Sequence, residues 1–384
     1  MHLSDMQQSH RIAQHDLVRY VRIAGRGGLP TNLYPALPAF PGSLLPTGMA
    51  ISVDNNVASG TQIGSGADAP QVLEGTDVLT VRGIFNSPVY QINPASGTFS
   101  YNPGAGTGSL VINKKSPTGV PQSLKPFDKA INGDPPDAPV AESILLVSPL
   151  EDSIYAVVEM DLSQSWTTEV GGEIESVTIG FITRDSDNAV AYLALSPGGQ
   201  YPGALNTVAY AGILEEYQFY IREARAISGD ASSELMPRLA RARLFPGTAV
   251  AHDPVNLAAD QADNILDLQI AFGVDTFPTD GLAIEGDGTD PTPTNTDEWL
   301  FNHSADDPTE VKWANVLANP SNLFYIRINT LARTDRPDAR FQAPLLTQIE
   351  DKDYTSAPFD QYNTDLERLY RRRILQTTVD LRNL

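Results

Sequence analysis

The sequence contains no cysteine among its 384 residues. This absence excludes structural disulfides, thiolate metal sites and thiol catalysis, but it leaves the compartment open because an exported protein need not be cross-linked. The chain also lacks any run of about 18 apolar residues, and no basic and then apolar signal pattern follows Met1. We therefore expect that nothing in the chain as written exports or anchors it, and that this chain is soluble.

Motifs of catalysis and of phosphate binding are also missing. No Gly-x-Ser-x-Gly is present, and the glycines at 104, 106 and 108 lack the Gly-Lys-Ser/Thr ending of a phosphate-binding loop. The histidines at 2, 10 and 15 are not four residues apart, the spacing that presents two imidazoles to one metal ion. We predict no enzyme, no catalytic residues and no cofactor; a catalytic triad assembled from distant residues is the outside alternative.

Composition indicates a chain rich in turns and β-structure. Gly and Pro number 29 each, which favours many turns over long helices. The net charge is −21, although both ends of the chain carry more arginine than acid. Binding to DNA requires Lys and Arg that displace condensed counterions, so an acidic body disfavours phosphate-rich partners. We expect no general nucleic-acid binding.

One amphipathic helix is predicted at the start of the chain. Leu3, Met6, Ala13, Leu17 and Val21 follow the 3.6-residue period of one helix face. Glycines at 25, 27 and 28 and a proline at 30 end the pattern. The helix is expected to end at residue 23 or 24.

The rest of the chain is predicted to form strands. Apolar residues alternate with polar ones over 154–162, 213–221, 266–274, 324–328 and 375–381, and the clearest alternation is at 266–274. Further strands are expected at 78–85, 144–147 and 177–181, whereas 30–70 shows no clear period. One helix followed only by strands predicts an α+β fold, with the helix packed on an antiparallel sheet.

Composition divides the chain into four parts. These are a helix at 1–29, a connection with the first strands at 30–85, a β-rich insertion at 86–210 and a sheet at 211–384. Within the insertion, residues 86–139 are rich in turn-forming residues and are expected to form an irregular segment or short strands. We expect no helix there.

An acidic segment at 277–310 is the one place where the sequence suggests a metal. Calcium takes six to eight oxygen ligands from carboxylates and carbonyls on a flexible loop. The candidate ligands are Glu285, Asp287, Asp290 and Asp297. Their spacing does not match the Asp-x-Asp-x-Asp-Gly calcium loop. Calcium binding is therefore one hypothesis, and an ordinary acidic surface loop is the other.

Several stretches, taken in order, resemble a known family. Residues 5–25 resemble the end of the long N-terminal helix of PilW-type minor pilins of type IV pili, with Tyr20 where the family often has Asp. Residues 74–82, EGTDVLTVR, resemble the family's Gly-Ser-Asp-x-Leu-x-Val-Arg strand, and 265–276, ILDLQIAFGVDT, its strand ending in Tyr-Gly-Val-Asp-Thr. Residues 313–316 with 324–333 are similar to the next strand pair, and 370–383 to the C-terminal ending.

The resemblance implies a pilin-like fold and a role in filament assembly. The expected role is to prime pilus growth, with a position at the filament tip. The implied partners are other minor pilins, the major pilin and, through an N-terminal anchor, the inner-membrane assembly machinery; the implied location is the periplasm, the inner membrane and the extracellular pilus. The leader, peptidase site and apolar half-helix with which such pilins begin are absent. We expect that this segment was removed or that the chain starts within the helix, and that this chain alone does not enter a filament.

Three questions stay open at this level. A minor pseudopilin of type II secretion, the J type, is the close variant, and a tip adhesin or ligand-binding module on the inserted β region is the alternative function. The terminal arginines either contact acidic faces of neighbouring subunits or simply solvate an outer surface, where ion pairs contribute little. These arginines are Arg11, Arg19, Arg22, Arg371, Arg372 and Arg373.

Overall fold

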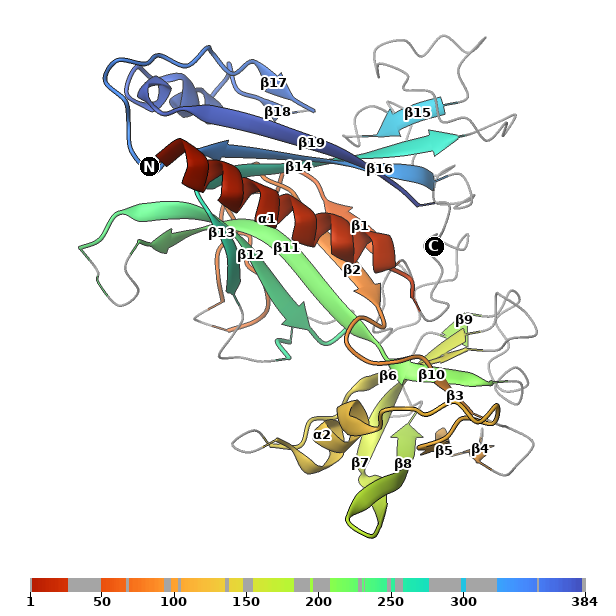
Figure 1. The fold of residues 1–384 in the computed structure, drawn as a ribbon. Helices are drawn as coiled ribbons and strands as arrows, with labels where there is room; N and C mark the ends of the chain where they lie inside the picture. The colour runs from red at the N-terminus through yellow and green to blue at the C-terminus, as the bar shows by residue number, and fades with distance from the viewer. Residues whose placement is uncertain are drawn as a thin grey trace.

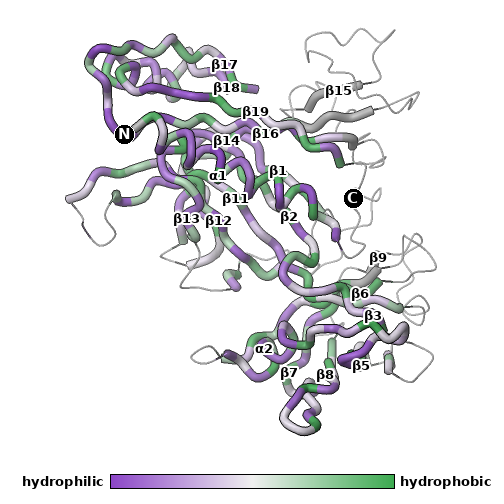
Figure 2. Tube along the Cα trace, viewed as in Figure 1, coloured by the Kyte–Doolittle hydropathy of each residue, from purple (hydrophilic) through white to green (hydrophobic). Residues whose placement is uncertain are grey.

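The fold combines three large antiparallel sheets, one two-stranded sheet and two α-helices among the described residues. The computed structural model describes residues 2–26, 50–66, 69–92, 98–102, 105–134, 138–147, 155–182, 194–195, 208–226, 230, 232–246, 250–252, 258–275, 298–301, 323–350 and 352–381. Figure 1 shows the first helix lying against strands, and apolar and polar residues alternate along many of these strands (Figure 2). The predicted α+β class, with an N-terminal helix packed on antiparallel sheet, is confirmed.

Two of the sheets meet at a single turn. The core sheet has the order β1 (Ile51–Asp54), β2 (Val78–Gly83), β11 (Glu215–Arg225), β12 (Leu235–Leu244) and β13 (Ala259–Asp263). The C-terminal sheet has the order β15 (Glu298–Phe301), β14 (Ile265–Asp275), β16 (Leu323–Arg333) and β19 (Arg372–Asp380). Asn264, with φ 61°, connects β13 to β14, and asparagine is among the residues that tolerate this left-handed conformation. The chain therefore passes from one sheet to the other through one residue.

The helix α1 (His2–Ile23) covers both of these sheets. It contacts β2 and β13 of the core sheet and β16 and β19 of the C-terminal sheet (Figure 1). Ala13, Leu17 and Val21 are fully buried in the core that the sheets share, as the 3.6-residue period predicts. The helix ends at Gly25, whose φ of 78° suits glycine and whose N–H donates to the Arg82 carbonyl at 2.8 Å.

The second sheet lies at the other side of the molecule from the C-terminal sheet (Figure 1). Its order is β3 (Tyr90–Gln91), β10 (Tyr210–Ile213), β6 (Ser143–Val147), β7 (Tyr155–Val170), β8 (Glu173–Ile182), β5 (Thr107–Asn113) and β4 (Phe99–Asn102), with β9 (Ala194–Leu195) beside β7. It has a hydrophobic cluster of its own, which includes Tyr90, Phe127 and Phe181. The chain then continues from β10 through Leu214 into β11 of the core sheet. The division into four parts made from composition stays a prediction.

A second helix corrects the expectation that only strands follow α1. The helix α2 (Lys125–Asn132) lies in the region that was expected to be irregular or to form short strands. Phe127, Ala130 and Ile131 are buried on one face, at the i, i+3, i+4 spacing of a helix, and Pro126 occupies the first turn, where no N–H is needed. Eight residues among prolines and glycines are too few to show a helical period in the sequence.

Most predicted strands are present, and several others were missed, of which β12 is the longest. The predictions at 78–85, 144–147, 154–162, 177–181, 213–221, 266–274, 324–328 and 375–381 correspond to β2, β6, β7, β8, β11, β14, β16 and β19. The strands β1, β12 and β13 were not predicted. In β12, arginines at 238, 241 and 243 interrupt the apolar run, and neighbouring strands complete its burial. Residues 313–316 lie outside the described residues.

The C-terminal region adds a layer over the C-terminal sheet. A hairpin of β17 (Gln348–Ile349) and β18 (Lys352–Asp353) is followed by the short 3₁₀ helices η5 (Phe359–Asn363) and η6 (Glu367–Leu369). Leu266, Leu331, Ile349 and Tyr354 form a small buried cluster beneath this layer. As a result, Asp267 on the polar side of β14 is buried, and the neighbouring Gln269 is buried where its amide donates to the Gly75 carbonyl at 2.9 Å, although their alternation with apolar residues is typical of a strand with one exposed face.

Candidate functional site: arginine surfaces and a polar junction

The predicted arginines of α1 project from its exposed face. Arg11, Arg19 and Arg22 are all exposed, while the opposite face of the helix is buried. None of the three makes an ion pair with any residue in the described ranges; Arg19 only approaches the Tyr20 ring, at 5.9 Å. Leu3 and Ile12 on the same helix are 44% and 47% exposed. The helix therefore presents guanidinium groups that have no ion-pair partner among the described residues, next to exposed aliphatic side chains.

The predicted C-terminal arginines divide into two groups. Arg371 pairs with Asp338 at 2.9 Å and lies 4.6 Å from the Phe341 ring centroid. Arg372 is half-buried, where burial lowers its pKa, and it donates hydrogen bonds to the carbonyls of Tyr362 and Glu367. Both of these side chains therefore hold the C-terminal layer in place.

Arg373 differs from its two neighbours because it is exposed. Its positive charge contributes to the lowered pKa of His10, so it lies beside α1. Its neighbour Ile374 is 46% exposed. Of the six predicted arginines, Arg11, Arg19, Arg22 and Arg373 thus lie on exposed parts of α1 and the adjacent strand β19, a surface that we call the α1–β19 face.

The predicted calcium ligands Glu285, Asp287, Asp290 and Asp297 lie outside the described residues. Within the part of the chain that the structure describes, no group of three or more His, Asp or Glu side chains could hold a metal ion. Within the predicted acidic segment 277–310, the structure describes only β15, which pairs with β14. Calcium binding stays a prediction.

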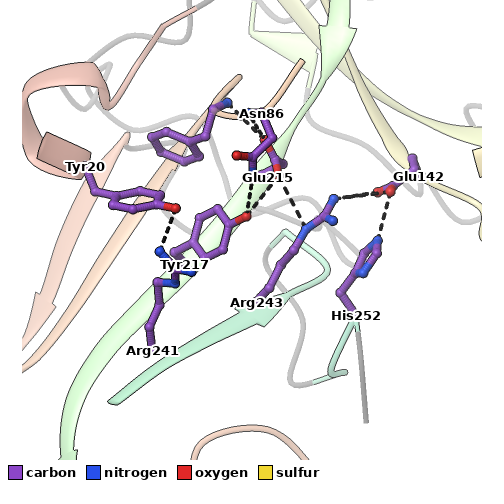
Figure 3. A network of polar contacts seen from close by, with 9 residues as sticks. Tyr20, Asn86, Glu142, Glu215, Tyr217, Arg241, Arg243 and His252 are labelled. Carbon is purple, nitrogen blue, oxygen red and sulfur yellow. Dashed lines mark hydrogen bonds and ion pairs between the residues drawn. The ribbon is translucent and has the colours of Figure 1, made fainter. Parts of the chain in front are cut away.

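A polar junction connects the second sheet to the core sheet (Figure 3). Glu142, just before β6, lies 2.8 Å from His252 Nε2 and accepts hydrogen bonds from Arg243 Nη2 at 3.2 Å. Burial favours a raised pKa for Glu142, but the hydrogen bonds and charges of His252 and Arg243 hold its pKa below the ordinary value. Glu142 is therefore an anion that joins the two sheets.

The junction continues through Glu215 at the start of β11. Glu215 is 2% exposed, and its carboxylate accepts hydrogen bonds from the N–H groups of Phe85 and Asn86, at 3.0 and 2.7 Å. The Asn86 amide at 2.7 Å and the Tyr217 hydroxyl at 3.0 Å also donate to it. Arg243 Nε lies 3.6 Å from the same carboxylate, so Arg243 is between Glu142 and Glu215. The four hydrogen bonds therefore fix the position of the Glu215 carboxylate at the start of β11.

Tyr20 brings α1 into the same region. Its hydroxyl accepts a hydrogen bond from Arg241 Nη1 at 2.7 Å, and the Arg241 guanidinium lies 4.9 Å from the Tyr20 ring centroid. The ring also packs against Phe85 and Tyr217, with centroids 5.1 and 4.9 Å away. Where the resembling family often has Asp, Tyr20 provides a hydrogen-bond acceptor for Arg241 together with an aromatic face.

Sequence reasoning found the arginines of α1 but not this junction. Glu142, Arg243 and His252 come from three segments with no motif in common, so their approach depends on how β6 and β12 are placed. The one available signal was the set of arginines at 238, 241 and 243 within a strand-like run. Charged residues within such a run need buried partners.

Comparison with known proteins gives one match. Residues 218–383 match a family model described as Type IV Pilus-assembly protein W. This range runs from within β11 to residue 383 and contains β14, β16 and β19, whereas α1 and all strands of the second sheet precede it. No curated protein and no solved structure matches the chain. Among the described residues, no helix is both long enough and apolar enough to span a membrane.

Proposed function

We propose that the chain is a minor pilin that helps to initiate pilus assembly, because residues 218–383 match the family model described as Type IV Pilus-assembly protein W. Its partners in this role are other minor pilins and the major pilin, and its place is at the filament tip. The observation that supports the role is the α1–β19 face. A surface of exposed arginines mixed with exposed aliphatic residues suits contact with acidic, partly apolar faces of neighbouring subunits.

The charges of this face provide the test. In the native host, the triple substitution Arg11→Glu, Arg19→Glu, Arg22→Glu should reduce the number of surface filaments at least tenfold and abolish co-purification with other pilins. The same change of charge in Lys125→Glu, Arg336→Glu, Arg340→Glu is the matched control, because these side chains are exposed elsewhere on the molecule. Thermal unfolding of both triple variants checks that the folds are equally stable. Normal filaments in the first variant would contradict the proposed interface.

A second candidate function is ligand binding by an exposed surface of the second sheet. The β7–β8 hairpin ends far from the C-terminal sheet (Figure 1) and carries Trp166 and Val170 at 53% and 64% exposure. An irregularity in the pairing between Asp161 and Trp166 precedes the exposed tryptophan. Irregular strand segments of this kind often redirect side chains at functional sites, and tryptophan is enriched at binding hot spots.

The irregularity between Asp161 and Trp166 is a β-bulge, and the residues around it fix its geometry. Ser163 and Ser165 donate hydrogen bonds to Asp161, and Gly180 N donates to Ser165 Oγ at 3.0 Å. A Cβ at Gly180 would lie 2.7 Å from the Gln164 carbonyl oxygen, so only glycine fits beneath the bulge. These contacts therefore hold the bulge in the conformation that exposes Trp166.

Substitution of the hairpin tip separates the two functions. If the second sheet binds a ligand, the double substitution Trp166→Ala, Val170→Ser should leave piliation unchanged and reduce attachment of piliated cells to host or abiotic surfaces. Unchanged attachment would remove this candidate. Deleting 86–139 would be a poor test, because Leu110, Ile112 and Phe127 from that region are fully buried in the second sheet's cluster.

A further inference from the structure

A lysine and an aspartate lie together in the interior beneath the C-terminal layer. Lys352 Nζ of β18 is 3.3 Å from Asp267 Oδ1 of β14, and the two side chains are 0% and 2% exposed. They come from different sheets, and the turn between β17 and β18 brings the lysine over the C-terminal sheet. Solvent therefore reaches neither group.

The lysine amine is surrounded by aromatic rings. Nζ lies 5.2, 4.5 and 6.0 Å from the ring centroids of Tyr354, Phe359 and Tyr362. Within the described part of the chain it makes no hydrogen bond of ordinary geometry, although an ammonium carries three donors. Removing an ammonium and a carboxylate from water costs several kcal/mol per ion, and the transfer of one proton from the amine to the carboxylate would replace the ion pair by two neutral groups. Burial raises the pKa of Asp267, in the direction of that neutral acid.

The two oxygens of the Asp267 carboxyl group have different partners. The Tyr354 hydroxyl donates a hydrogen bond to Oδ2, and Gln269 Nε2 donates one to Oδ1 at 3.2 Å. A donor on Oδ1 stabilises negative charge that develops there when the carbonyl carbon is attacked. A hydroxyl on Oδ2 can supply the proton that a leaving oxygen needs.

We propose that Lys352 and Asp267 condense to an intramolecular amide bond that joins β18 covalently to β14. A proton first passes from Lys352 Nζ to the Asp267 carboxylate, whose Oδ2 then carries it; Nζ attacks Cγ, the Cγ–Oδ2 bond breaks, and Oδ1 remains as the amide oxygen. Tyr354 gives its proton to the departing oxygen and regains one from the nitrogen, so one water molecule leaves and no oxidant or other reactant is needed. Groups held this close in a dry site react with effective molarities of about 10⁵ M or more, which offsets the barrier to direct condensation.

The bond would compensate for the small apolar core beneath the C-terminal layer. Four buried side chains form that core, with Leu346, Phe359 and Tyr362 partly buried against them, which is little apolar area for holding the C-terminal layer. A covalent link between β14 and β18 restricts the unfolded chain in the same way as a disulfide. It does so in a chain that contains no cysteine.

The mass of the purified full chain tests the proposal. Under denaturing conditions, the intact mass should be lower than the sequence mass by one water molecule, and a tryptic digest should contain the peptides of residues 267 and 352 joined. Lys352→Met should restore the full sequence mass of that variant, whereas Lys125→Met, at an exposed lysine of α2, should keep the deficit. The wild-type digest decides the question even if Lys352→Met does not fold.

A second variant examines the role of Tyr354. Tyr354→Phe keeps the ring and removes the proton donor, so the deficit should develop about a hundredfold more slowly after folding. Wild-type protein that keeps its full mass for days after folding, with separate tryptic peptides, would show an ion pair only and would overturn the proposal. The proposed function in pilus assembly does not depend on this result.

Discussion

At the residue scale, the contacts of α1 show how polar groups are used inside the fold. His10 is 1% exposed, and its Nε2 lies 2.6 Å from Thr330 Oγ1 of β16. The Gln14 amide donates to the Ile328 carbonyl at 3.1 Å and accepts from the Thr330 hydroxyl at 2.9 Å. These contacts fix the rotation of α1 on the C-terminal sheet. His10 therefore has a structural role that its spacing from the other histidines did not reveal.

The stability of the protein should depend on pH through His10. Burial lowers the pKa of His10 from 6.5 to about 4, with a further lowering by the charge of Arg373. Because the unfolded chain binds the proton more tightly, the contribution of His10 is complete above pH 6.5 and is lost as pH falls toward 4. The loss amounts to about 3 kcal/mol across this range.

Denaturant unfolding at several pH values measures this effect. His10→Gln, which cannot be protonated, should flatten the pH dependence between pH 4 and 6.5, whereas His15→Gln, at a side chain that is 79% exposed, should leave it unchanged. Parallel curves for the wild type and His10→Gln would contradict a buried neutral imidazole.

At the element scale, α2 is the main organiser of the second sheet. Phe127 is fully buried, and its ring centroid lies 4.9 Å from that of Tyr90 in β3. The helix also contacts β7, and the Val140 N–H donates to the Ala130 carbonyl at 2.9 Å. The helix thus covers the sheet face that would otherwise expose its apolar side chains.

Truncating the buried ring of α2 should unfold the second sheet selectively. Phe127→Ala should cost about 3–5 kcal/mol, the usual cost of deleting a buried phenylalanine. In hydrogen exchange, amides of β5, β6 and β8 should lose protection while those of β14 and β16 keep it. Val120→Ala, at a side chain that is 59% exposed, is the control. Equal loss of protection in every sheet would contradict the division of the chain at 86–210.

At the scale of the whole molecule, the polar junction fixes the second sheet relative to the core sheet. Glu142 comes from the second sheet's side, and Arg243 and His252 from the core sheet's side. Arg243 also reaches Glu215, the carboxylate that holds the start of β11. The α1–β19 face and the exposed hairpin tip therefore belong to one connected framework.

Neutralising Glu142 should loosen this connection without unfolding either sheet. Glu142→Gln should cost about 2 kcal/mol, because Arg243 and His252 lose a charged acceptor. Small-angle scattering should show a larger radius of gyration, and the midpoint of thermal unfolding should fall. Since the pKa of Glu142 is held below its ordinary value, the wild type should lose this contribution as pH falls through the lowered pKa. An unchanged scattering profile would show that the junction does not set the arrangement.

The sequence by itself determined the elements whose pattern is local. The 3.6-residue period of α1 and the alternation in β14, β16 and β19 are set by which side chains face the core, so both could be predicted. The arginines of α1 were predictable for the same reason, because a helix with one apolar face exposes the other. The resemblance at 265–276 and 370–383 agrees with the family match over 218–383.

Only the tertiary structure decided which distant residues meet. Asp267 was assigned to the polar side of β14, yet Lys352 and Tyr354 cover it because the C-terminal layer folds over that side. Glu142 and Arg243 meet for a similar reason, since strand order and register place them together and no local period encodes either. Periodicity reports whether a side chain faces inward, but the identity of its partner depends on topology and register.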